Sequence, residues 1–305
     1  MLVAERMAIF FLLMMVGLVI RRFGIITQEN QRSLSSLVVN VGCPALILSS
    51  VAGGVPRLSG DEFFETILTV AATIAILLVF AQILPILMSY GEKERGAVRD
   101  MLVFTNIAFM GIPLILGVYG QDAILYLTLF ILPFNLLFFS YGVQTMRVGG
   151  GKMSWSPKNL LNPGIIACSL TILLYALEIT LPVILVEPLK ILGGLTTPLA
   201  MLLIGASLAD LSFAGIFSDK KLLAFISVKM IIFPTAYLLA LQNFSQNRFL
   251  LGAYFVALAM PTGNMVAMLA TLYNKEAYSL TVKEISLTTA ISVVTLLLVA
   301  FLTNI

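Results

Sequence analysis

Two short segments hold the residues with the clearest potential to bind a small molecule. Both lie inside long apolar stretches, where a proline interrupts a helix and no water can satisfy the freed backbone groups. The broken ends must then face a cavity or a ligand, which is how membrane transporters build a substrate site from backbone. The residues concerned are Asn106, Gly111, Ile112 and Pro113 in the first segment and Pro261, Thr262, Gly263 and Asn264 in the second.

Side-chain amides in these segments favour an anionic ligand. Asn106 and Asn264 each offer hydrogen-bond donors and an acceptor. Unwound backbone adds free N–H groups, and the N-terminus of the following half-helix adds partial positive charge. These groups suit a carboxylate, so we predict that both asparagines bind the substrate. The alternative is that such side chains only bond neighbouring helices together, at roughly 1 kcal/mol or less per bond.

Two further apolar stretches contain a proline beside polar residues. Asn40 lies four residues before Pro44, and Thr196 and Thr197 directly precede Pro198. We include Asn40 among the candidate substrate ligands. We interpret the two threonines as helix-packing residues, because hydroxyl groups commonly bond neighbouring membrane helices.

Lys229 is the one charged residue well inside a predicted span. Burying an unpaired ammonium there costs at least about 3 kcal/mol, so it should face a substrate anion, a carboxylate or the carbonyls of broken helices. Alternatively, its side chain reaches the cytoplasmic interface. We expect no carboxylate at mid-depth, because Glu284 and the other acidic residues fall near span ends. That expectation argues against cation/proton exchange and leaves potential-driven anion movement, or coupling to an ion held by backbone oxygens.

Nothing in the sequence indicates a cofactor, a metal or an enzyme. The chain has no histidine, and its two cysteines, Cys43 and Cys168, lie in apolar segments without zinc-site spacing. No nucleophile paired with a base stands out, and neither does a phosphate-binding loop. Basic patches interleaved with aromatic residues are also lacking, so we expect no nucleic-acid partner.

Membrane helices must position these residues. The chain is 60% hydrophobic and only 11% charged, against roughly 25% charged in a soluble domain. Long neutral runs separate the charged residues, and a spanning helix needs about 20 residues. The first run also resembles the core of a signal peptide, but no small-residue cleavage site follows it. We predict ten spans in the lipid bilayer, at residues 4–22, 32–52, 62–90, 97–118, 122–146, 163–181, 188–209, 219–242, 248–272 and 283–303.

The two halves of the chain repeat each other in opposite orientation. Five predicted spans lie in residues 1–146 and five in residues 163–305, on either side of a polar, glycine-rich connection at 147–162. An odd number of spans in each half inverts the second half, and matching helix breaks in an inverted repeat indicate a transporter site. The matching prolines are Pro44 with Pro198 and Pro113 with Pro261.

Most of the 18 Lys and Arg residues fall in odd-numbered connections. Positive residues stay on the cytoplasmic side of a membrane, so both termini should be extracytoplasmic. We therefore expect a multi-pass protein of the inner (plasma) membrane.

Several strings resemble the auxin efflux carrier family, which includes plant auxin exporters and bacterial permeases for malate or malonate. The string from Thr105 to Gly120, TNIAFMGIPLILGVYG, closely resembles the family's fourth helix. Shorter strings resemble other helices: NVGCPALI from Asn40, NPGIIA from Asn162, PLAMLLIGASL from Pro198 and MPTG from Met260. The resemblance covers essentially the whole chain, but the long hydrophilic central loop of the plant exporters is missing.

This resemblance implies an all-α membrane fold of ten helices as a 5+5 inverted repeat, similar to sodium/proton antiporters and bile-acid symporters. Spans 1, 2, 6 and 7 would form a scaffold domain and mediate a homodimer. Spans 3–5 and 8–10 would form a transport domain in which broken helices 4 and 9 cross. The family's substrate-binding asparagine matches Asn106.

The leading hypothesis is a secondary active transporter of a small organic anion, with coupling to Na⁺ or H⁺ left open. A sodium-coupled symporter of the bile-acid type is the first alternative and would need a sodium cage. A membrane channel or receptor is the alternative from another class, but rings of charge or a filter sequence are not apparent.

Overall fold

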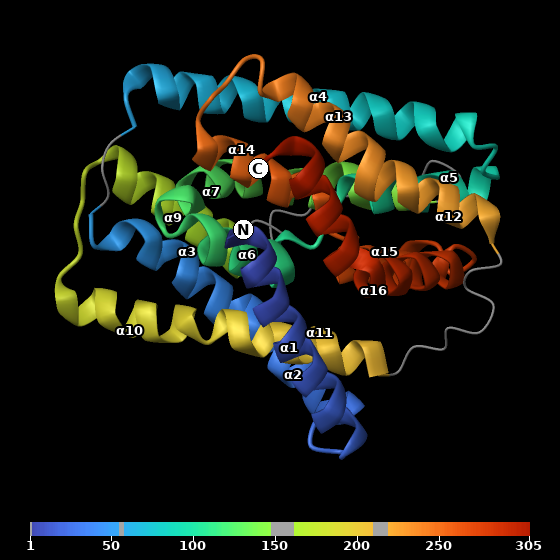
Figure 1. The fold of residues 1–305 in the computed structure, drawn as a ribbon, viewed down its shortest axis with the longest axis horizontal. Helices are drawn as coiled ribbons and strands as arrows, with labels where there is room; N and C mark the ends of the chain where they lie inside the picture. Colours follow the sequence, from blue (N-terminus) through green and yellow to red (C-terminus); the bar gives the residue numbers. More distant parts are fainter. Residues whose placement is uncertain (1, 55–57, 148–161, 210–218) are drawn as a thin grey trace.

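The computed structural model describes residues 2–54, 58–147, 162–209 and 219–305, which form helices joined by short connections (Figure 1). Within these ranges the only extended pairing is a single bridge, which agrees with the predicted all-α class. The α-helices are α1 (Leu2–Arg22), α2 (Gln28–Leu37), α3 (Cys43–Ala52), α4 (Gly60–Leu87), α5 (Glu92–Val103), α6 (Ile112–Tyr119), α7 (Asp122–Leu137), α8 (Val143–Met146), α9 (Pro163–Ala176), α10 (Val183–Gly194), α11 (Thr196–Ala209), α12 (Lys220–Ser227), α13 (Phe233–Leu241), α14 (Arg248–Ala259), α15 (Asn264–Tyr273) and α16 (Tyr278–Thr303). The π-helical turns in the described residues are η1 (Val38–Gly42), η2 (Ile107–Gly111), η3 (Phe138–Gly142) and η6 (Val228–Ile232).

Six stretches of the described residues are long and apolar enough to span a membrane. They are Gln28–Ala52, Gly60–Leu87, Asp122–Met146, Val183–Ala209, Lys220–Leu241 and Tyr278–Thr303. The shorter apolar helices are Ile107–Tyr119, Pro163–Ala176, Arg248–Ala259 and Asn264–Tyr273. Two of the predicted spans, 97–118 and 248–272, are each divided by an interruption, and a third, 163–181, contains only the shorter helix Pro163–Ala176.

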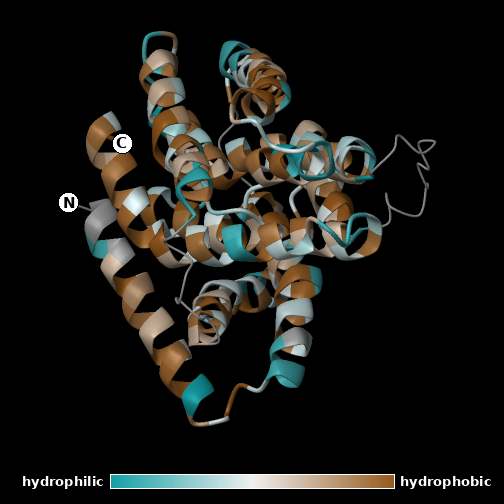
Figure 2. Ribbon diagram, turned by 90° about the vertical axis from the view of Figure 1, so that its right-hand side faces the viewer, coloured by the Kyte–Doolittle hydropathy of each residue, from teal (hydrophilic) through white to brown (hydrophobic). Residues whose placement is uncertain are grey.

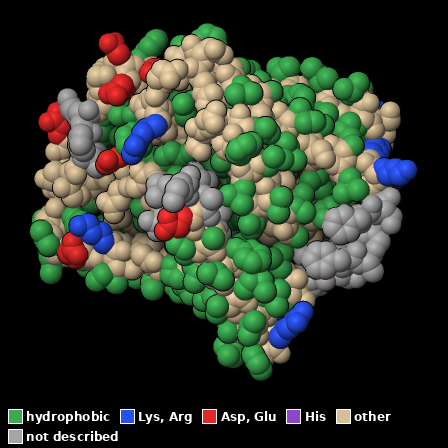
Figure 3. All heavy atoms as spheres, viewed as in Figure 1, with side chains coloured by type: hydrophobic (Ala, Val, Ile, Leu, Met, Phe, Trp, Pro, Cys, Tyr) green, Lys and Arg blue, Asp and Glu red, His purple; other side chains and the backbone are tan. Residues whose placement is uncertain are grey.

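The outer surface suits a lipid environment. Large apolar side chains are widely exposed, among them Phe64 at 68% on α4 and Ile184 at 79% on α10. Figure 2 shows hydrophobic residues along the helices, with hydrophilic residues mainly in the connections and at helix ends. Figure 3 shows apolar side chains over most of one face, with charged groups mostly toward its edges. An apolar surface this extensive indicates a protein embedded in a membrane.

Two helix interruptions lie against each other near the centre of the fold. One separates α5 from η2 at residues 104–106, and the other separates α14 from α15 at residues 260–263. The segments pair antiparallel at Thr105 and Thr262. The backbone N–H of Asn106 donates to the Pro261 carbonyl at 2.7 Å, and that of Gly263 donates to the Phe104 carbonyl at 2.9 Å. We call these paired segments the bridge; it satisfies backbone groups that no water could reach inside a bilayer.

The first interruption lies upstream of the position that the sequence suggested. Gly111-Ile112-Pro113 does not break its helix, because the π-helical turn η2 leads directly into α6 and the Ile112 N–H bonds to the Ile107 carbonyl. The wider turn accommodates a proline, which lacks an N–H and clashes with the carbonyl four residues earlier. Pro44 likewise follows η1, so the second predicted span bends there without ending.

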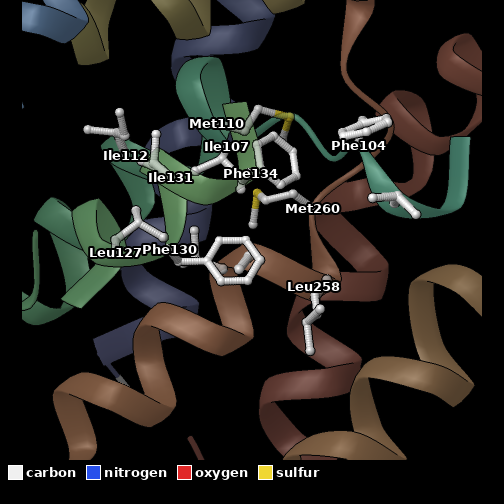
Figure 4. Packing of buried hydrophobic residues seen from close by; sticks show 14 of the residues in the cluster. Phe104, Ile107, Met110, Ile112, Leu127, Phe130, Ile131, Phe134, Leu258 and Met260 are labelled. Carbon is white, nitrogen blue, oxygen red and sulfur yellow. The ribbon is translucent and has the colours of Figure 1, made fainter. Parts of the chain in front are cut away.

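Aromatic packing holds the bridge in place (Figure 4). The Phe104 ring makes edge-on contacts with Phe134 of α7 and Phe138 of η3, at centroid distances of 5.4 and 5.0 Å. Met260, from the opposing segment, lies in the same buried cluster. Edge-to-face aromatic pairs add about 0.5–1.5 kcal/mol beyond their buried area, so this cluster favours one position of the bridge.

Helices from the two ends of the chain approach closely where glycines allow it. α1 packs along α11, and α3 packs against α9 and α10. A Cβ atom on Gly205 would lie 1.8 Å from the Met14 carbonyl oxygen, and one on Gly17 would lie 2.1 Å from the Leu202 carbonyl oxygen. Small residues permit such backbone approach between membrane helices. These contacts join the elements predicted to form the scaffold.

Candidate functional site

A cavity of about 120 Å³ lies beside the bridge. Its size is comparable to the roughly 150 Å³ apolar cavity that holds benzene in another protein. Both halves of the chain contribute to its walls. The lining lies in the η1–α3 stretch, in the bridge, in η2, α6 and α7, and at the starts of α9 and α15. The lining residues are Val39, Cys43, Ile47, Thr105, Asn106, Ile107, Ala108, Phe109, Ile112, Ile131, Phe134, Asn135, Asn162, Gly164, Gly263, Asn264 and Met265.

Two helix N-termini meet at this cavity. Asn106 precedes η2, and its side-chain oxygen accepts a hydrogen bond from the Phe109 N–H at 3.4 Å. Gly263 precedes α15 and offers no side chain to cap that helix. The first N–H groups of a helix lack carbonyl partners within the helix and carry partial positive charge. The cavity therefore presents an electropositive backbone surface without a positively charged side chain.

Side-chain amides supply most of the polar lining. Asn106 is 8% exposed, and Asn264 is exposed at the cavity wall. Two further asparagines, Asn135 of α7 and Asn162 before α9, also line it. The side-chain oxygen of Asn162 accepts from the Gly164 N–H at 2.9 Å, which leaves its NH₂ group as a donor. Together these amides can orient a carboxylate.

Sequence reasoning did not include Asn135 and Asn162 among the ligands. Asn135 lies two residues after Pro133 in an apolar run. The same pattern of a polar residue near a proline could therefore have indicated it as a ligand. Asn162 forms an Asn-Pro helix start, a common structural cap that by itself does not indicate a ligand. The cavity also contacts Cys43, whose thiol donates to the Ala108 carbonyl at 3.4 Å.

The rest of the lining is apolar, and none of the lining residues carries a charge. Phe109, Phe134, Ile131 and Met265 are among its apolar residues. A pocket with apolar walls and a few converging polar groups is the usual form of a small-molecule site. It suits a small molecule with one polar end and an apolar body.

The predicted site residues divide into those that line the cavity and those that support it. Asn106, Ile112, Gly263 and Asn264 line it. Five others are buried but lie outside the lining: Gly111, Pro113, Lys229, Pro261 and Thr262. Gly111 allows close packing, since a Cβ there would lie 2.8 Å from a Val256 methyl group.

The structure does not bring Asn40 to the cavity, which corrects the prediction for this residue. Asn40 is exposed, and its side-chain NH₂ donates to the Ser36 hydroxyl at 2.9 Å. Val39 and Cys43 line the cavity instead. Adjacent helical residues point about 100° apart, so a neighbour of a lining residue can face elsewhere.

Thr196 packs between helices, but its hydroxyl oxygen has no hydrogen-bond partner among the described residues, so it does not form the bond that the interpretation assumed. It is fully buried, and a Cβ on Gly42 would lie 2.7 Å from its hydroxyl oxygen. Thr197 is half-buried, and neither threonine lines the cavity. Thr196 belongs to the contact between α11 and η1, through its approach to Gly42.

Lys229 lies outside the cavity lining, in contact with the bridge. Its ammonium donates to the Thr262 hydroxyl and to Oε1 of Glu284, the latter at 3.3 Å. Lys229 is 1% exposed and Glu284 is fully buried. The alternative that this lysine reaches the membrane interface is therefore wrong.

Glu284 is a fully buried carboxylate, although the sequence placed it near the end of a span. α16 begins at Tyr278, five residues before the predicted span at 283–303. Glu284 therefore lies roughly 9 Å along the helix, at 1.5 Å per residue. The predicted span began at residue 283 because charged residues were taken as the ends of spans. Glu284 was therefore placed closer to the end of its helix than it lies.

Comparison with known proteins agrees with this architecture. A family model described as membrane transport protein matches residues 2–300. An uncharacterized transporter of Methanocaldococcus jannaschii is 24% identical over 305 residues, which cover 95% of each chain. The match to the family model extends over nearly the whole chain, including both segments of the bridge. The chain therefore belongs to the membrane transport protein family, the family of the auxin efflux carriers.

Proposed function

We propose that this protein is a secondary active transporter whose substrate is a small carboxylate. The observation that carries the proposal is the meeting of two helix N-termini and four asparagine side chains at one neutral cavity. Helix N-termini and side-chain amides stabilise a carboxylate without a permanent charge. A site of this kind binds an anion moderately and releases it readily, as transport requires.

The position of the cavity supports movement by alternating access. One wall comes from the predicted scaffold, through Val39, Cys43 and Gly164. The facing wall comes from the predicted transport domain, through Asn106 and Asn264. A shift of one group of helices against the other would expose the substrate to alternate sides of the membrane.

The wider architecture is part of the same proposal. It comprises ten spans as a 5+5 inverted repeat, with halves at 1–146 and 163–305 and a cytoplasmic connection at 147–162. The scaffold helices would form a homodimer in the inner membrane of the cell. Both termini would lie on the extracytoplasmic side of that membrane. The connection at 148–161 lies outside the described residues.

A binding screen and an exchange assay test the proposal together. Purified protein is screened by thermal shift against pyruvate, lactate, malonate, malate, succinate and benzoate, with and without sodium. Radiolabelled forms of the compounds that raise the melting temperature are then measured for counterflow in proteoliposomes. At least one carboxylate should stabilise the protein and exchange across the membrane, whereas stabilisation by none of them would count against the proposal.

A further inference from the structure

Lys229 and Glu284 form an ion pair inside the helix bundle, which we call the buried pair. The Lys229 ammonium lies 3.3 Å from Oε1 of Glu284, with side-chain exposures of 1% and 0%. The Thr262 hydroxyl accepts from Lys229 and lies 2.8 Å from the same carboxylate oxygen. Removing two charges from water costs several kcal/mol per ion, which a single contact does not fully recover. A buried pair of this kind is therefore a candidate for function rather than for stability.

The second carboxylate oxygen of Glu284 makes the buried pair incomplete. Oε2 is buried and has no hydrogen-bond partner among the described residues. Buried polar atoms without a partner are rare, and an unpartnered carboxylate oxygen is where a proton can bind. The described residues contain no cluster of three metal-ligating side chains, and a proton needs none.

Tyr90 carries a second buried polar group without a partner among the described residues, and Glu284 acts on it electrostatically. Its hydroxyl is buried and also lacks a partner among the described residues. Burial raises the pKa of Tyr90, and the charges of Asp219, Glu94 and Glu284 raise it further, so the phenol stays a neutral hydroxyl. Asp219 is exposed, and the ammonium of the half-buried Lys221 lies 3.9 Å from the centre of the Tyr90 ring. The Tyr90 hydroxyl is therefore a neutral group, unpartnered within the described part of the chain, on which both a surface carboxylate and Glu284 act electrostatically.

Few other charges act on Glu284 from the elements packed around α16. The sequences of α11, α13 and α15 contain no charged residue, and the charged residues of α1, α12 and α14 lie at helix ends. On α5, Glu92, Lys93, Glu94 and Arg95 lie at the start of the helix, Arg99 is half-buried, and Asp100 is fully buried with its Oδ1 accepting from the Thr145 hydroxyl at 2.6 Å. Lys283, the neighbour of Glu284 on α16, is exposed. Lys229 is therefore the main charge that acts on this carboxylate.

The bridge links the buried pair to the cavity. Thr262 contacts the buried pair through its side chain, while the next residue, Gly263, lines the cavity. Across the bridge, Asn106 both lines the cavity and donates its N–H to the Pro261 carbonyl. A change of charge at Glu284 therefore acts one residue away from the substrate site.

We propose that Glu284 in the buried pair is a proton-binding site coupled to carboxylate transport. Hydronium gives its proton to Oε2 and becomes water, so the carboxylate becomes a neutral acid while Lys229 remains an ammonium. The buried pair changes from zero net charge to one positive charge, which favours a monoanion in the adjacent cavity. After the movement, Glu284 returns its proton to water on the other side. One proton thus accompanies one monoanion. This inference rests on the proposed carboxylate transport for its coupling step, but not for proton binding.

Infrared spectroscopy tests proton binding without a substrate. Wild-type protein in nanodiscs is compared between mildly alkaline and mildly acidic pH, and the band of a protonated carboxyl group should grow on acidification. The band should be lost in Glu284→Gln and in the charge-neutral pair variant Lys229→Gln/Glu284→Gln, and retained in Asp100→Asn. Melting temperatures establish that each variant is folded. A band equally strong without Glu284 would overturn the proposal.

Transport in proteoliposomes tests the coupling, with radiolabelled pyruvate and malonate as probes. With the membrane potential clamped, a pH difference of one unit should drive up to about tenfold accumulation when one proton accompanies each anion. The variant Lys229→Gln/Glu284→Gln should still show counterflow but lose this accumulation. The matched control is Lys93→Gln/Glu276→Gln, which removes an exposed pair 2.9 Å apart and should leave accumulation unchanged.

The two proposals fail in different ways. Counterflow by wild-type protein with no response to the pH difference would overturn the coupling and leave carboxylate transport standing. Absence of counterflow for both probes would count against carboxylate transport, while the infrared result still decides whether Glu284 binds a proton.

Discussion

The backbone N–H of Asn106 donates to the carbonyl oxygen of Pro261 at 2.7 Å, across two helix interruptions that lie 155 positions apart in the chain. This bond comes from the Asn106 backbone, whereas its side chain lines the cavity and accepts from the Phe109 N–H. A mutation can therefore remove the Asn106 side chain from the cavity while the backbone bond of the bridge remains.

Asn106→Ala should abolish carboxylate binding and counterflow while the protein stays folded, with the melting temperature lowered only by the loss of the cap bond to the Phe109 N–H. The bridge bond comes from the backbone and survives the substitution. The matched control is Asn40→Ala, which removes an exposed amide outside the cavity and should leave transport unchanged. Normal transport by Asn106→Ala would remove this residue from the site.

A carboxylate should bind more tightly than the amide of the same shape. Each helix N-terminus contributes up to about 1 kcal/mol toward an anion, and two meet at the cavity, which predicts roughly a 30-fold difference. Isothermal titration of pyruvate against pyruvamide measures this ratio. Equal affinities would mean that the helix N-termini do not face the ligand.

Lys229→Met alone should destabilise the protein more than Lys229→Met/Glu284→Gln. Removing one partner leaves the other charge buried, at about 3–5 kcal/mol, whereas replacing both with neutral groups is often near neutral. The comparison is made from melting temperatures at neutral pH. A double variant less stable than Lys229→Met would show that the two positions stabilise the fold separately.

Gly205→Ala should lower the melting temperature, because its Cβ would lie 1.8 Å from the Met14 carbonyl oxygen and force α1 away from α11. Overpacking of this kind costs about 1–3 kcal/mol. Gly194→Ala is the control, since a Cβ there has no heavy atom within 4 Å. If both variants melted at the same temperature, the close approach of the two helices would not be important for stability.

The sequence predicted the helical class and both helix interruptions, because an apolar run containing a proline has few ways to satisfy its backbone. It misplaced the first interruption, since a π-helical turn accommodates Pro113 and the chain opens instead at residues 104–106. Nothing local distinguishes these outcomes, because the bridge forms only when the opposing segment is present.

Contacts between residues far apart in the chain could not be predicted from the sequence, because the packing of the helices decides which residues meet. Lys229 and Glu284 lie 55 residues apart and meet only through the packing of η6 against α16. Asn40 was misassigned because a proline close by does not reveal which side of the helix faces inward. Asn135 and Asn162 reach the cavity from α7 and from the start of α9, which pack against each other.

The central claim, that the cavity beside the bridge binds the transported carboxylate, is tested most directly by the reactivity of Cys43. This thiol lines the cavity, and the other cysteine, Cys168, is buried outside it and can be replaced by serine. The rate at which methyl methanethiosulfonate modifies Cys43 is measured with and without the carboxylates that undergo counterflow. The account predicts that these compounds slow the modification and that Asn106→Ala removes the protection. A transported carboxylate that leaves the Cys43 rate unchanged would contradict it.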